Sequence, residues 1–194
     1  MKEKYNIFVL SILAGILIGV GVIINTTLTI PIVGPLLFSF GLLSIIELKL
    51  PLYTGRIGYI GKQKHLGAIL AGNFVGVTGL VGAYTIAQPN FENILTLEKV
   101  VTKFSKTPLE LFLLGCICGI LIHFAVRIKN PFTTMMAIMI FILIGAEHCI
   151  ADFPYFLVNP TWLNSFKFLM IVLGNSIGAI AIELMLNVRE GNLC

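Results

Sequence analysis

The chain has 194 residues, of which 57% are hydrophobic and only 11% are charged. A soluble domain has about a quarter of its residues charged, and no soluble fold of this length could bury so much apolar surface. The composition therefore predicts an integral membrane protein with the lipid bilayer as its solvent. The net charge of +4 comes without a basic cluster interleaved with aromatic residues, which excludes a nucleic-acid partner.

Six apolar runs follow one another along the chain. A straight membrane-spanning helix needs about 20 residues, which the first, third, fourth and sixth runs provide. The second run ends at Glu47 and Lys49 before Pro51, and the fifth ends in charged residues before Pro154. Short, interrupted segments at corresponding places in two halves are typical of transporter binding sites. The runs are Ile7–Ile24, Ile30–Leu48, Leu66–Ile86, Leu109–Val126, Met135–Ile150 and Phe168–Leu186.

The two halves of the chain repeat a GxxxG motif, and small residues four apart let helices approach closely. Corresponding motifs lie 100 residues apart in the first run of each half and 102 apart in the third. Three spans per half give the halves opposite orientations. The sequence thus predicts a single all-α channel domain over 1–194, with inverted repeats over about 6–88 and 108–187 and with broken helices two and five. The motifs are Gly15–Gly19, Gly115–Gly119, Gly72–Gly76 and Gly174–Gly178.

The distribution of lysine and arginine predicts the orientation, because cytoplasmic loops carry more of these residues than external loops do. With the N-terminus inside, the inner side has more of them than the outer side, so both termini are expected in the cytoplasm and the loop over 88–108 outside. We expect the protein in the cell (inner) membrane. The inner residues are Lys2, Lys4, Arg56, Lys62, Lys64, Arg127, Lys129 and Arg189, and the outer ones are Lys99, Lys103, Lys106 and Lys167.

His148 lies where the fifth run breaks, next to Glu147. An ionisable residue in a membrane faces protein or a water-filled cavity. We interpret His148 as a pore-lining donor that hydrogen-bonds a passing anion or shuttles a proton, and a neutral histidine packed between helices is the alternative. Asp152 completes a cluster of ligand-type residues, but this spacing does not place the three on one helical face. We therefore expect neither an enzyme nor a metal or other cofactor.

Four more polar residues lie inside the apolar runs. For His123 and Glu183 we favour structural pairing between helices. Asn73 and Asn175 each follow a glycine of a repeated motif. Each could hydrogen-bond a neighbouring helix, or it could bond broken backbone or the permeant species. The four cysteines, Cys116, Cys118, Cys149 and Cys194, have neither a disulfide pattern nor zinc spacing.

Six short segments together resemble the formate/nitrite transporter family along nearly the whole chain. The first helix of that family is similar to 12–21 (ILAGILIGVG), and its broken second helix to 38–42 (FSFGL) and 52–55 (LYTG). Its third and sixth helices resemble 72–76 (GNFVG) and 174–178 (GNSIG). Its Glu-His signature resembles 145–151 (GAEHCIA), and Lys103 matches the lysine that precedes the fourth helix.

The resemblance implies an aquaporin-like protomer in a homopentamer, each protomer having its own pore for small monovalent anions. It makes His148 the central pore histidine, with Thr54 facing it and Asn175 nearby. It places Lys103 toward the outer vestibule, in a segment outside the lipid whose mutation should leave assembly intact. It also implies two hydrophobic constrictions, one formed by Leu42, Leu52 and Tyr53 and the other by Phe38, Ile122 and Phe141.

Four positions depart from the family pattern. Tyr53 replaces a phenylalanine and adds a hydroxyl to a dry constriction, Asp152 and Gly119 stand where asparagine is usual, and Lys49 stands where a small residue is usual. The function implied is a passive or proton-coupled channel for formate, nitrite, hydrosulfide or short carboxylates. A pore for neutral small solutes is the alternative within transport, and a membrane-embedded enzyme or sensor is the alternative from another class. The sequence does not identify the anion.

Overall fold

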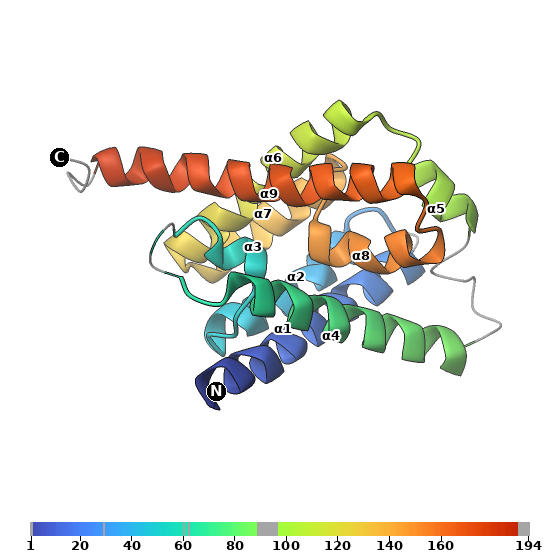
Figure 1. Cartoon of the computed structure of the whole chain (residues 1–194), viewed down its shortest axis with the longest axis horizontal. Coiled ribbons are helices and arrows are strands. Elements are labelled where there is room, and N and C mark those ends of the chain that lie inside the picture. The colour runs from blue at the N-terminus through green and yellow to red at the C-terminus, as the bar shows by residue number, and fades with distance from the viewer. Residues whose placement is uncertain (1, 29, 60, 62, 89–96, 190–194) are drawn as a thin grey trace.

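The computed structural model describes residues 2–28, 30–59, 61, 63–88 and 97–189, and their regular secondary structure is helical (Figure 1). The predicted outer loop over 88–108 is described only at residue 88 and from residue 97, and Lys62 and Cys194 lie outside the described residues. The helices are α1 (Lys2–Thr27), α2 (Val33–Glu47), α3 (Tyr53–Arg56), α4 (Leu66–Ala87), α5 (Leu97–Lys103), α6 (Pro108–Ile128), α7 (Pro131–Leu143), α8 (Cys149–Val158) and α9 (Trp162–Arg189).

Four of these helices, α1, α4, α6 and α9, are long and apolar enough to cross a membrane. They coincide with the first, third, fourth and sixth predicted spans. A local signal sets the start of α6: Thr107 and Glu110 form a reciprocal capping box, and Pro108 occupies the first turn, where its missing N–H costs nothing. The apolar helices α2, α7 and α8 are shorter.

The second and fifth predicted spans are each divided between two helices. Helix α2 ends at Glu47, and α3 begins after a short non-helical segment. In the fifth predicted span, whose break the sequence places at Glu147 and His148, α7 ends at Leu143 and α8 begins at Cys149. Of the residues between the two helices, Ala146, Glu147 and His148 are buried, whereas Ile144 is exposed.

Close backbone contacts join α1 to α4 and α6 to α9, and glycines make them possible. A Cβ on Gly15 would overlap the Asn73 carbonyl, and a Cβ on Gly119 would overlap the Asn175 carbonyl. Gly15 and Gly119 thus make the same kind of contact and lie 104 residues apart, whereas the repeated motifs lie 100 residues apart.

The short helices α3 and α8 lie between the two long pairs (Figure 1). Helix α8 contacts α4 and α9, whereas α3 contacts α6 and α4. Aromatic packing holds α8 there: Phe153 stacks on Phe74 of α4 with a centroid distance of 3.9 Å, and it also contacts Phe168 of α9. The start of α1 and the end of α9 lie at the same end of the bundle, at the left of Figure 1.

Candidate functional site: two broken helices and a cavity

The same turn ends α2 and α7. Lys49 and Gly145 have positive φ angles of 54° and 70°, and they lie 96 residues apart. In each case the next N–H bonds the carbonyl five residues back, from Leu50 to Ile45 and from Ala146 to Phe141, both at 2.9 Å. This is a Schellman termination, which favours glycine at the left-handed residue. The departure of Lys49 from the small residue usual there therefore places a bulky side chain in a conformation that disfavours it.

Two asparagines satisfy the backbone that the breaks expose. The Asn73 amide accepts the Tyr53 N–H at 2.9 Å and donates to the carbonyls of Pro51 and Ser11 at 3.0 and 2.8 Å. Pro51 lies in the segment that joins α2 to α3, and Tyr53 is the first residue of α3. The sequence left open whether the amide bonds a helix or broken backbone, and it bonds both.

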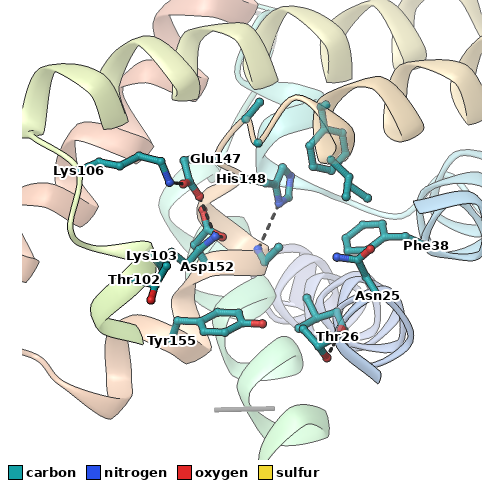
Figure 2. Close-up of a pocket in the computed structure, with 16 residues that line it drawn as sticks. Asn25, Thr26, Phe38, Thr102, Lys103, Lys106, Glu147, His148, Asp152 and Tyr155 are labelled. Carbon is teal, nitrogen blue, oxygen red and sulfur yellow. Dashed lines mark hydrogen bonds and ion pairs between the residues drawn. The ribbon is translucent and has the colours of Figure 1, made fainter. Parts of the chain in front are cut away.

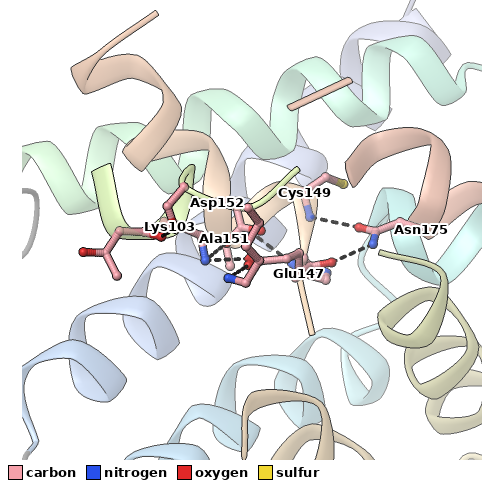
Figure 3. A network of polar contacts seen from close by, with 10 residues as sticks. Lys103, Glu147, Cys149, Ala151, Asp152 and Asn175 are labelled. Atoms are coloured by element: carbon pink, nitrogen blue, oxygen red, sulfur yellow. Dashed lines mark hydrogen bonds and ion pairs between the residues drawn. The ribbon is translucent and has the colours of Figure 1, made fainter. Parts of the chain in front are cut away.

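Asn175 repeats this arrangement at the second break. It accepts the Cys149 N–H at 2.9 Å and donates to the carbonyls of Glu147 and Gly115 at 2.8 and 2.9 Å (Figure 3). Unpaired backbone groups in a membrane interior are costly, so these amides allow the chain to leave the helical conformation there. The Asn175 amide thus binds the residue that follows His148.

His148 is the first residue before α8, and it caps that helix. Its Nδ1 accepts the Ala151 N–H at 3.2 Å. A neutral ring with Nδ1 as acceptor has its hydrogen on Nε2, which therefore donates to Thr54 Oγ1 at 3.0 Å. Both side chains are buried. Thr54 thus faces His148 as expected, and its own hydroxyl hydrogen has no acceptor among the described residues.

A cavity of about 730 Å³ opens onto His148. In Figure 2 the charged residues lie on one side of this cavity, and Asn25 and Phe38 lie on the other. Phe38 and Phe141 both line it and meet edge to face with a centroid distance of 6.0 Å. Two of the three residues predicted for one constriction therefore lie together next to His148. The third, Ile122, is buried and does not line the cavity.

The cation predicted for the vestibule, Lys103, lies between two carboxylates. Its Nζ is 2.7 Å from Glu147 Oε2 and 2.7 Å from Asp152 Oδ1 (Figure 3). Burial alone would lower the pKa of Lys103, but the charges of Asp152 and Glu147 outweigh it and hold that pKa above its usual value. A bond from Lys167 Nζ to the Phe104 carbonyl at 2.7 Å fixes the end of α5 and so positions Lys103.

Sequence reasoning missed this convergence. Glu147 and Asp152 would point apart on a continuous helix, but Glu147 precedes α8 and extended backbone at His148 redirects it. Lys106 also contacts the cluster, 3.0 Å from Glu147 Oε1. The signal that could have revealed the cluster is the pair of lysines in one short external segment opposite two acidic residues at a predicted break.

A second cavity of about 330 Å³ lies beside the first break. Leu52 of the other predicted constriction lines it, together with Lys49 and Arg56, whereas Leu42 and Tyr53 are buried and do not line it. Leu52 lies 96 residues before His148, and both precede their short helix with extended backbone. The corresponding loop position is thus apolar in one half and a hydrogen-bonding histidine in the other.

The hydroxyl of Tyr53 is occupied. It lies 2.9 Å from Ser176 Oγ, and Ser176 donates its own hydrogen to the Val172 carbonyl at 2.7 Å. Tyr53 must therefore be the donor to Ser176. The expectation that this hydroxyl makes a constriction polar is revised accordingly, because its hydrogen is used within the protein.

A separate polar contact joins α6 to α9. His123 Nε2 lies 2.9 Å from Glu183 Oε2, and Arg127 Nε is 3.6 Å from the same oxygen. His123 and Glu183 are both buried. This is the structural pairing that the sequence favoured, and it lies away from the residues that line the larger cavity.

Comparison with known proteins identifies the relatives of this arrangement. The sequence profile described as formate/nitrite transporter matches residues 2–189. The chain belongs to the formate/nitrite transporter family. The resemblance carried by the six segments is confirmed. The comparison with curated proteins finds no match.

Solved structures share the fold of this family member. One, described as a pentameric formate channel with formate bound, is 22% identical with a TM-score of 0.77, covering 97% of each chain. Another, described as an FNT family ion channel, is 21% identical with a TM-score of 0.80, covering 97% of this chain and 91% of the other. The all-helical architecture with apolar helices is therefore that of the family.

Proposed function

We propose that this protein is a channel for small monovalent anions or their conjugate weak acids, such as formate, nitrite, hydrosulfide or short carboxylates. Its architecture is six transmembrane spans in two inverted repeats, with α2–α3 and α7–α8 as broken spans. The constant offset between the two Schellman turns and the matched asparagine bonds support the repeat. Family membership supports transport rather than catalysis.

One observation carries the proposal: the larger cavity ends at His148, whose ring is held by its own helix and by Thr54. Both ring nitrogens are bonded within the protein, so the ring binds a small solute when its Nε2–H turns from Thr54 to that solute. Phe38 and Phe141 next to the ring give the solute an apolar passage. A site of this composition holds a small oxyanion or acid briefly and does no covalent chemistry on it.

The energetics of the passage limit what crosses. A bare anion in an apolar constriction loses much of its hydration, which costs several kcal/mol or more. Helix α8 begins at Cys149, so the positive end of its dipole lies at His148 and offsets part of that cost. A neutral acid avoids most of the penalty. The site therefore suits monovalent species that exchange readily between anion and acid.

We further propose that five copies assemble with a pore in each protomer, as in the related pentameric formate channel, and that both termini face the cytoplasm of the cell (inner) membrane. The position of the α1 and α9 ends at one end of the bundle supports termini on one side. Native mass spectrometry tests the number of copies, and a monomer as the stable species would contradict the proposal.

The experiment that tests the function is flux through purified protein in liposomes. Formate, nitrite, hydrosulfide and acetate should enter vesicles that contain the protein faster than they enter protein-free vesicles. Chloride, which has no weak conjugate acid, should cross far more slowly. Flux of water or ammonia with none of these anions would favour the neutral-solute pore instead.

A further inference from the structure

Four charged side chains sit at the entrance of the larger cavity, and their contacts leave no cation uncompensated. The Lys103 ammonium touches both Glu147 and Asp152 at 2.7 Å. Lys106 contacts the other oxygen of Glu147 at 3.0 Å. All four residues line the cavity. We call Lys103, Lys106, Glu147 and Asp152 the entrance cluster.

The entrance cluster has two positive and two negative formal charges, which cancel. The carboxylates are almost fully buried, with side-chain exposures of 3% and 5%, so solvent screens them little. An approaching anion therefore meets a dipolar surface rather than a net positive one. Lys103 alone would attract anions into the cavity, but two carboxylates at contact distance counter it.

Asp152 is the member whose charge decides this balance. Glu147 contacts both lysines, whereas Asp152 contacts Lys103, so Asp152 supplies the second negative charge that balances the two cations. Without the Asp152 charge, the contact between Lys103 and Glu147 would persist and the cluster would have a net charge of +1. The charge of this one side chain at the start of α8 thus decides whether the cavity entrance is neutral or cationic.

We propose that Asp152 is a specificity-determining residue: by cancelling the charge of Lys103, it makes entry insensitive to the charge of the solute, so that the neutral weak acid competes effectively with its anion. This inference rests on the proposed channel function. It predicts that wild-type flux of anions depends weakly on ionic strength, because the entrance supplies no net attraction.

The test compares wild type, Asp152→Asn and the double variant Asp152→Asn/Lys106→Gln in liposomes. Asparagine has nearly the shape of aspartate and still offers Lys103 an oxygen. At low salt and about pH 9, where both carboxylates are ionised, the half-saturation concentration for formate should fall about tenfold in Asp152→Asn, the effect of one unit charge a few Å from a partly hydrated ion. The gain should shrink at high salt. The double variant restores neutrality and should return to wild-type behaviour.

The outcomes distinguish a failure of this inference from a failure of the proposed channel function. If all three proteins conduct formate with the same half-saturation concentration at low salt, Asp152 does not set the entrance charge and the inference fails alone. If none conducts any of the anions while each elutes as the native assembly, the channel function fails and takes the inference with it. Should Asp152→Asn not assemble, Glu147→Gln removes one negative charge from the same cluster and must show the same increase in affinity and salt dependence.

Discussion

Replacing Asn175 with leucine removes, at nearly constant volume, the side chain that holds the second helix break together. Three buried backbone groups lose their partner: the Cys149 N–H and the carbonyls of Glu147 and Gly115. Hydrogen bonds between membrane helices average about 0.6 kcal/mol, which sets a lower limit near 2 kcal/mol for three. Leaving a buried group unsatisfied costs about 1–3 kcal/mol. We therefore expect a loss of at least about 3 kcal/mol.

For a chain of this length that loss corresponds to a fall of about 6–12 °C in Tm. Thermal unfolding in detergent, followed by size-exclusion elution after heating, measures it. Asn164→Leu is the matched control in the same helix, because that amide makes one bond, to the Asn159 carbonyl, near the helix start. Asn73→Leu should behave like Asn175→Leu. A Tm for Asn175→Leu no lower than that of the control would refute the idea that this amide supports the break.

Three further substitutions test individual contacts. Lys49→Gly relieves the left-handed backbone and should raise stability by about 0.5–1 kcal/mol, and a lower Tm would contradict the strain argument. Tyr53→Phe should cost about 1 kcal/mol through the lost bond to Ser176 and leave the ratio of fluxes between formate and nitrite unchanged, and a shifted ratio would place the hydroxyl in the pathway. Lys103→Met leaves two buried carboxylates with one fewer cation and should lower the free energy of unfolding by about 3 kcal/mol, in addition to changing flux. A variant as stable as wild type would show that these ion pairs contribute little.

The long helices could be predicted from the sequence because membrane spans follow from length and hydropathy alone. The breaks could be anticipated from Pro51 and from the charged residues before Pro154, since both features oppose a continuous helix. The expectation that Thr54 faces His148 came from the resemblance, and the two side chains lie within hydrogen-bonding distance. Nothing in the local pattern near Thr54 would have revealed it, because its partner lies 94 residues away.

Other features depend on three-dimensional geometry that no spacing encodes. Gly15 and Gly119 make the same kind of contact 104 residues apart, whereas the repeated motifs lie 100 residues apart. Lys103 was expected to be a cation outside the lipid whose removal would spare assembly. Its ion pairs with Glu147 and Asp152 indicate that it has a structural role as well. That role arises because the break turns Glu147 toward Asp152.

Formate flux through liposomes containing wild type, His148→Phe or His148→Asn tests the central claim most directly. Asparagine can keep the cap, since its oxygen can accept the Ala151 N–H, and it retains an N–H donor, although that amide is too short to reach Thr54 as Nε2 does. Phenylalanine keeps neither. The account predicts that His148→Asn retains part of the flux and that His148→Phe, eluting as the native assembly, conducts no faster than empty vesicles. Wild-type flux through His148→Phe would contradict the claim that permeation runs through this histidine.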